Sequence, residues 1–259
     1  MKDIQSQKDT RHVEIQKVGV RNVHIPMIIP EKSGSIQNVS AEVELNASLS
    51  SDMRGTHMSR FMEILNKYSK ITLSYESLKN ILSETKEALK SSSVSMNIKF
   101  RYYIEKQAPI SLKKGLIDYI CGFKASLDEN FKTILHLEIP IITLCPCSKE
   151  ISEYGAHNQR AYVKINIEYD RDDVLWFEDL THDIEKLASG ELYSILKRPD
   201  EKAVTERAYE NPKFVEDIVR DTAIYLKQAE GTINFDVECE SEESIHNHNA
   251  FAYVNFGIY

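Results

Sequence analysis

The feature that most restricts the fold of this sequence is the alternation of apolar with charged or polar residues along several segments. In residues 42–47, Val43, Leu45 and Ala47 each follow a glutamate or an asparagine. Side chains on a strand point alternately to its two faces, so this pattern predicts a strand with one face in the core and the other in water. One-sided strands of this kind are typical of antiparallel sheets.

The predicted elements follow a repeated order of two strands, two helices and two strands. In the helices, apolar residues such as Phe61, Ile64 and Leu65 recur at helical spacing. The predicted strands are 13–29, 41–49, 94–104, 115–127, 133–144, 161–169, 233–239 and 250–258, and the helices are 59–68, 75–89, 177–188 and 212–228. We therefore expect an α+β fold of two tandem ββααββ-like modules, 1–128 and 129–259, with antiparallel sheets and helices on one face. Duplication is one interpretation, although the halves show no obvious residue identity.

Charge and composition restrict the class of protein. Lys and Arg total 32 against 40 for Asp and Glu, a net charge of −8 without a basic tail, which disfavours general nucleic-acid binding. An anionic substrate is still compatible with this net charge, because its binding depends more on a local basic pocket than on the total charge. The polar start of the sequence and the lack of a long apolar span predict a soluble cytoplasmic protein. Four unevenly spaced cysteines do not form a disulfide framework and fit a reducing compartment.

Residues 144–160 contain the most chemically informative motif, in which two thiols precede a histidine. Cys145 and Cys147 flank Pro146, in either an extended segment or a bend, and His157 follows. Thiolate and imidazole are good ligands for divalent transition metals. Two alternatives stay open: Cys145 as a small buried hydrophobe beside a hydrogen-bonded His157, and Cys147 as a nucleophile with His157 or His246 as its base.

Other candidate residues also have two interpretations. Glu216 either forms a surface ion pair with Arg220, four residues later, or belongs to a functional site. Glu201 lies in a predicted proline-containing loop among basic residues, as part of a solvated charge cluster or of a site. In residues 55–60, Thr56 or His57 caps a helix, or Arg60, hydroxyls and the helix N-terminus grip a phosphate.

Five blocks in their usual order carry a family resemblance that spans nearly the whole chain. The first is Gly55-Thr56-His57-Met58-Ser59-Arg60-Phe61, and the second is the cysteine segment 144–160. The others are 196–202, which reads Leu-Lys-Arg-Pro-Asp-Glu-Lys, 205–217, which starts Thr-Glu-Arg-Ala-Tyr-Glu-Asn-Pro, and 243–248, which reads Glu-Ser-Ile-His-Asn-His. Together they resemble the type IB GTP cyclohydrolases, which open the purine ring of GTP to make 7,8-dihydroneopterin triphosphate. No departure is seen at the functional positions, and the least typical part is the N-terminus.

The resemblance implies a tunnelling fold with two modules per chain, the second carrying most of the metal ligands. It also implies a homotetramer with active sites at subunit interfaces. The implied metal ligands are Cys147, His157, Glu201 and Glu243. This mixed sulfur, nitrogen and oxygen set suits zinc or manganese and tolerates iron. No organic cofactor is expected.

The resemblance also assigns roles in a hydrolytic reaction. Glu216 would accept the N1–H and 2-amino protons of guanine, because a carboxylate is an acceptor only. A metal-activated water would attack C8, with Cys147, His246 and His248 as catalytic residues and the histidines moving protons. The candidates for binding the rest of the substrate, chiefly its triphosphate, are His57, Arg60, Lys149, Arg160, Lys197 and Arg198.

Two rival functions belong to other classes. A noncatalytic, zinc-stabilised interaction module would keep the cysteines but would not need Glu216. The tunnelling-fold nitrile reductase of queuosine synthesis would use a cysteine nucleophile and NADPH, but the histidine and glutamate blocks fit a hydrolytic metal site better.

Overall fold

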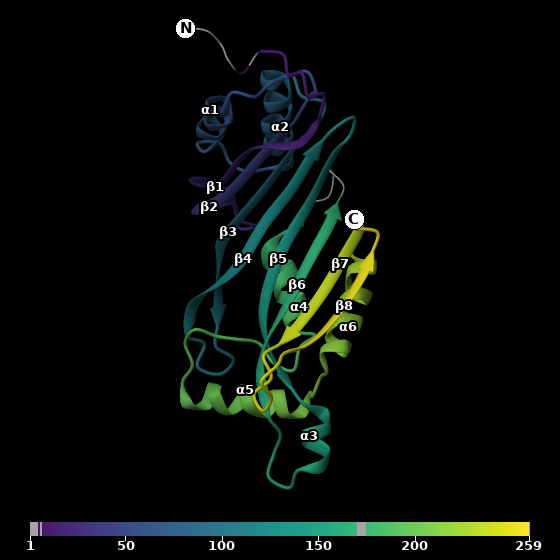
Figure 1. Ribbon diagram of the computed structural model, residues 1–259. Helices are drawn as coiled ribbons and strands as arrows, with labels where there is room; N and C mark the ends of the chain where they lie inside the picture. The colour runs from purple at the N-terminus through teal and green to yellow at the C-terminus, as the bar shows by residue number, and fades with distance from the viewer. Residues whose placement is uncertain (1–4, 6, 170–174, 259) are drawn as a thin grey trace. The chain divides into compact units, whose positions relative to one another are not determined.

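The computed structural model describes residues 5, 7–169 and 175–258. In it, eight strands form one sheet and are hydrogen-bonded in chain order from β1 to β8. The pairs β1–β2, β2–β3, β6–β7 and β7–β8 are antiparallel. The strands are β1 Ile15–Pro30, β2 Ile36–Leu49, β3 Val94–Gln107, β4 Lys114–Leu127, β5 Phe131–Leu144, β6 Asn158–Tyr169, β7 Thr232–Ser241 and β8 Ala250–Phe256 (Figure 1).

The helices are α1 Met58–Tyr68, α2 Tyr75–Leu89, α3 Pro146–Ile151, α4 Phe177–Glu185, α5 Arg198–Glu210 and α6 Val215–Gln228. The α+β class expected for a tunnelling fold is confirmed. Each half of the chain has two strands, then helices, then two strands, with additional helices in the second half. The predicted helix 75–89 has the bounds of α2, whereas α6 starts three residues later than the predicted 212 and α4 ends three residues before the predicted 188.

The chain divides into two compact units, residues 1–101 with 122–134 and residues 102–121 with 135–259. In the first unit, α1 packs against β1 and α2 against β2 (Figure 1). The alternation predicted from sequence is present, since Val43 and Leu45 are fully buried and Glu42 is exposed. Burial of each such side chain stabilises the fold by roughly 1.5–3 kcal/mol. The boundary between modules at 128 stays a prediction.

The second unit is built in a similar way. On β6, Val163 and Ile165 are fully buried, and α6 packs against β7 and β8. Ile218 and Leu226 of α6 contribute its fully buried stripe. Just before α6, the N–H of Lys213 donates to the carbonyl of Leu144 at 3.1 Å, which holds the start of the helix beside the end of β5.

Two helices correct the predictions from sequence. The segment after Cys145 is neither extended nor a simple bend, because Pro146 is the first residue of α3, where its missing N–H is not needed. Glu201 does not lie in a loop: Pro199 is in the first turn of α5, which the ring tolerates, so Glu201 is helical. In the described part of the chain, no helix is long and apolar enough to span a membrane.

Candidate active site

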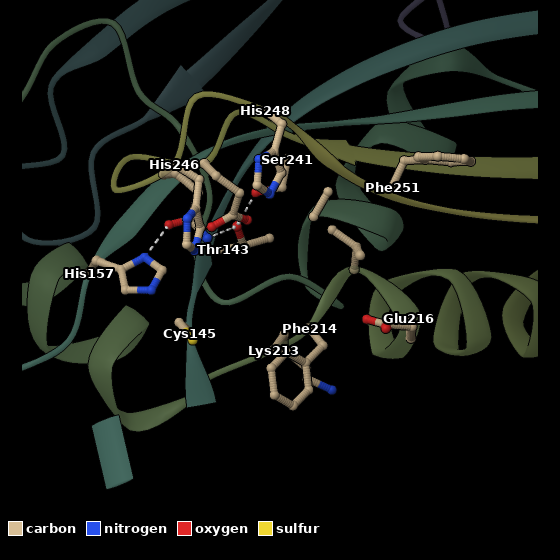
Figure 2. A pocket seen from close by; sticks show the side chains of 14 residues that line it. Thr143, Cys145, His157, Lys213, Phe214, Glu216, Ser241, His246, His248 and Phe251 are labelled. Carbon is tan, nitrogen blue, oxygen red and sulfur yellow. Dashed lines mark hydrogen bonds between the residues drawn. The ribbon is translucent and has the colours of Figure 1, made fainter. Parts of the chain in front are cut away.

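A cavity of about 420 Å³ in the second unit brings together residues from four strands or their ends, from the α6 start and from the loop between β7 and β8. It contains six of the titratable residues singled out from the sequence, namely Cys145, His157, Glu216, Glu243, His246 and His248. Its lining comprises Thr143, Cys145, His157, Gln159, Lys213, Phe214, Val215, Glu216, Ser241, Glu243, His246, His248, Ala250 and Phe251 (Figure 2).

The cysteine motif is shaped by the N-terminus of α3. Cys145 is the N-cap residue, and its Sγ accepts a hydrogen bond from the backbone N–H of Ser148 at 3.4 Å. The backbone N–H of Cys145 donates to the carbonyl of His157 at 3.2 Å. In return, the N–H of His157 donates to Oγ of Ser148 at 3.3 Å. These bonds hold Cys145 and His157 next to each other, while Cys147 is exposed and lies outside the cavity lining.

The imidazole of His157 takes part in a short hydrogen-bonded chain. Its Nδ1 lies 2.9 Å from Oε1 of Gln159, whose Nε2 donates to Oγ1 of Thr143 at 3.0 Å. Thr143 Oγ1 in turn lies 3.3 Å from Oγ of Ser241. Thr143 and Ser241 are buried, so no water competes freely for these groups.

The loop between β7 and β8 carries Glu243 and both histidines. The N–H of Glu242 donates to the carbonyl of Arg160 at 2.9 Å, and Asn249 Nδ2 donates to Oε1 of Glu240 at 3.0 Å. The bonds from Asn249 and then Lys164 lower the pKa of Glu240. These contacts fix both ends of the loop.

His246 and His248 stack between those ends. Their ring centroids lie 5.0 Å apart with an interplanar angle of 16°. Both side chains are exposed, and Glu243 is half-buried. The loop therefore presents two imidazoles and a carboxylate to the same cavity.

Glu216 lies in the first turn of α6, and its carboxylate points toward the cavity (Figure 2). Negative charge is stabilised at this end of a helix. The alternative of a surface pair with Arg220 is wrong, because Arg220 pairs with Asp217 at 3.3 Å. Lys213, another cavity residue, forms an ion pair in which its Nζ lies 2.6 Å from Oδ2 of Asp221.

Two of the remaining basic candidates, Lys149 and Arg60, have partners outside the cavity. Lys149 donates to the carbonyl of Tyr209 at 2.6 Å and lies over the Tyr209 ring. Arg60 of the first unit donates to the carbonyl of Ala88 at 2.6 Å. His57 is the half-buried N-cap residue of α1 and makes no side-chain capping bond there.

The start of α5, with Lys197, Arg198 and Glu201, is organised by a buried carboxylate. Asp200 accepts backbone N–H groups of Ile110, Ser111 and Lys197 at 2.7–2.8 Å. Burial alone would raise the pKa of Asp200, but these hydrogen bonds hold it well below its usual range. Lys197, Arg198 and Glu201 are exposed and, like Arg160, do not line the cavity.

The expected metal ligands are thus divided, with His157 and Glu243 in the cavity and Cys147 and Glu201 exposed. Among the described residues, no group of three or more His, Cys, Asp and Glu side chains could hold a metal ion. The chemistry of the donor set nevertheless fits a divalent transition metal, since thiolate, imidazole and carboxylate all suit zinc. The four-residue ligand set stays a prediction.

Several cavity residues were not singled out from the sequence, notably Thr143, Gln159, Lys213, Ser241 and Phe251. Gln159 follows His157 by two residues at the start of β6, and strand spacing could have placed the two on one face. The other four carry no local signal, because their roles depend on which strands and loops meet.

Comparison with known proteins gives matches over nearly the full length. A family model described as type I GTP cyclohydrolase folE2 matches residues 1–252. The chain is 48% identical over 256 residues to GTP cyclohydrolase FolE2 of Thermosipho africanus, covering 98% of each chain. It is 47% identical over 257 residues to GTP cyclohydrolase FolE2 of Dictyoglomus thermophilum, covering 99% of this chain and 98% of that one.

Among solved structures, the chain is similar to urate oxidase from Bacillus subtilis 168, with 9% identity and a TM-score of 0.47. This match covers 93% of this chain and 97% of the urate oxidase.

Proposed function

Since the chain belongs to the FolE2 family of type I GTP cyclohydrolases, we propose that it converts GTP and water into 7,8-dihydroneopterin triphosphate and formate. The product would serve folate synthesis or the synthesis of a modified tRNA base. The observation that carries this proposal is one cavity that holds a purine-type acceptor, Glu216, together with two stacked imidazoles and the clamped His157.

Glu216 is suited to hold the guanine. Its carboxylate has two acceptor oxygens and no donor, which complements the adjacent N1–H and 2-amino N–H groups of guanine. A ring with acceptors at those positions would meet repulsion instead. Glu216 therefore both orients the base and selects guanine over adenine.

His246 and His248 are suited to move protons at the imidazole ring of the base. Addition of water at C8 and cleavage of the ring require protons at N7 or N9, and release of formate from the resulting formamide requires another transfer. Histidine exchanges protons readily near neutral pH. The ribose then opens, rearranges and closes on the freed amine, and no redox step is involved.

A divalent ion held by Cys147, His157, Glu201 and Glu243 would supply Lewis acidity at the water and the base. Zinc, manganese and iron are the candidates. We include in the proposal a homotetramer whose subunits share each site. The exposure of Cys147 and Glu201 supports this part, because exposed ligand atoms are accessible to a neighbouring subunit.

Five basic residues are proposed for the triphosphate, namely Arg60, Lys149, Arg160, Lys197 and Arg198. None of them lines the cavity. They therefore belong to the proposal as candidates for the outer, charged end of the substrate, with His57 as a further contact.

The test is anaerobic incubation of metal-free protein with GTP after separate addition of zinc, manganese or iron. Formate and the fluorescence of the oxidised pterin are followed together. Metal-dependent formation of both supports the proposal and ranks the ions. Absence of both with every ion, from a folded protein, contradicts it, and NADPH consumption with a nitrile substrate would favour the reductase instead.

A further inference from the structure

The hydrogen bonds of Gln159 have a direction that determines the state of His157. Nε2 of Gln159 donates to Oγ1 of Thr143 at 3.0 Å, so the other end of the amide, Oε1, faces Nδ1 of His157 at 2.9 Å. An amide oxygen only accepts. With the amide in this orientation, Nδ1 of His157 carries the hydrogen.

A neutral imidazole has a single N–H, so a hydrogen on Nδ1 leaves Nε2 with its lone pair. Thr143 is compatible with this direction, because its hydroxyl can accept from Gln159 while it donates to Ser241, 3.3 Å away. Thr143 is 1% exposed and Ser241 fully buried, so the chain of bonds ends in the core rather than in water.

The main chain of His157 is fixed as well. Its carbonyl accepts from the N–H of Cys145, and its own N–H donates to Ser148. Backbone and ring are thus held by separate sets of bonds. Among the residues that the structure describes, Gln159 is the one that contacts the ring at Nδ1 by a hydrogen bond.

We propose that Gln159 is a positioning residue that locks His157 in the Nδ1–H tautomer, so that Nε2 is the nitrogen available to a divalent cation. The relevance of this cation rests on the proposed function, whereas the tautomer does not. Hydrogen bonds to the distal nitrogen of a metal-binding histidine commonly have this effect, and their loss weakens metal binding by about 10- to 100-fold.

The test reads the tautomer directly, in metal-free protein without GTP. Long-range ¹H–¹⁵N spectra of protein labelled with ¹⁵N-histidine are recorded at about pH 8.5, well above the ordinary histidine pKa of about 6.5. The chain has eight histidines, and the signals of His157 are those that the His157→Gln variant loses. The wild type should show protonated Nδ1 and unprotonated Nε2 at His157.

Two variants separate positioning from general structure. Gln159→Leu should lose the tautomer preference and bind zinc about 10- to 100-fold more weakly. Gln159→Glu can still accept from Nδ1–H and should keep the tautomer, although it cannot donate to Thr143. Gln37→Leu, which alters a glutamine bonded to Glu31 in the first unit, should change neither property.

A protonated Nε2 at His157 in the wild type would overturn the proposal, as would a folded Gln159→Leu protein with unchanged tautomer and zinc affinity. If Gln159→Leu does not fold, the spectra of the wild type and of Gln159→Glu still show whether His157 holds the Nδ1–H tautomer. Because these measurements need no turnover, this inference can fail while GTP hydrolysis stands, and it can hold while GTP hydrolysis fails.

Discussion

Nζ of Lys106 lies 2.6 Å from Oε2 of Glu185, and both side chains are almost completely buried. Burial raises the pKa of Glu185, and the attraction of Lys106 opposes that rise. Tyr119 donates to the other oxygen of Glu185 at 2.9 Å, and Glu191 lies 3.0 Å from the same ammonium. The charge of Glu185 in the second unit therefore depends on Lys106.

Removal of this ammonium should destabilise the protein strongly. Lys106→Met leaves a buried carboxylate without its cation, and we expect a loss of about 3 kcal/mol in the free energy of unfolding. Lys106→Met with Glu185→Gln should recover part of it. The control is Lys114→Met, which breaks an exposed pair with Glu105 and should change stability by less than about 1 kcal/mol. Denaturant unfolding measures the stability of all three variants. Equal losses of stability in Lys106→Met and Lys114→Met would contradict this account.

Acid should selectively remove the contribution of one pair in the first unit. Arg21 donates to both oxygens of Glu44, at 2.6 and 2.9 Å, and these bonds, followed by one from Asn46, lower the pKa of Glu44 to about 2. A lowered carboxyl pKa stabilises the fold above the ordinary value of 4.5, and this stability is lost as the pH falls toward 2.

The matching experiment compares wild type with Arg21→Met. Because Arg21 is largely exposed, the difference in unfolding free energy at neutral pH should be about 1 kcal/mol or less. It should shrink as the pH falls from about 5 to about 2. A difference that is constant over this range would show that the guanidinium acts by packing alone.

Guanine recognition is tested at Glu216. Glu216→Gln replaces one acceptor oxygen with a donor, so we expect kcat/KM for GTP to fall by about 100-fold, from two charge-assisted bonds of about 1.5 kcal/mol each. Arg220→Met is the control. Arg220 pairs with Asp217 rather than Glu216, so its loss should leave kcat/KM within about twofold. Comparable losses in both variants would restore the surface-pair interpretation.

Substitutions of the two cysteines should affect metal binding and stability separately. Cys147→Ser is expected to lose bound metal and activity together, because Cys147 is the proposed ligand. Cys145→Ala removes the cap on Ser148 and should lower stability by about 1 kcal/mol while metal content, measured by mass spectrometry, is retained. Loss of metal from Cys145→Ala alone would assign the ligand role to the cavity cysteine instead.

The sequence predicted the eight strands that the structure describes and helices α1, α2, α4 and α6, because each has a clear apolar face. The alternation in β2 and the stripe of α2 bury residues at the expected spacing. Helix α5 was missed because only Asp200 and Ala208 are buried along it, which leaves no apolar stripe to detect. Helix α3 has no buried residue at all and is only six residues long.

Prediction of the site was limited because some of its residues gain a role only through tertiary contacts. His157, Glu216, Glu243 and the two loop histidines could be singled out because their side chains suggest chemistry on their own. Gln159 had only its two-residue spacing from His157 to mark it, and Thr143 had no local signal, because their contact forms only when β5 and β6 bring them within 3.0 Å.

The cavity wall extends along the chain from Thr143 to Phe251. The loop that carries His246 and His248 is closed only when β8 pairs with β7. A truncated product that ends before Ala250 would retain Glu216 and His157 but not the strand that fixes this loop. Such a product would leave His246 and His248 in an unpaired tail, so the two stacked imidazoles would no longer be held beside the cavity wall that Glu216 and His157 form.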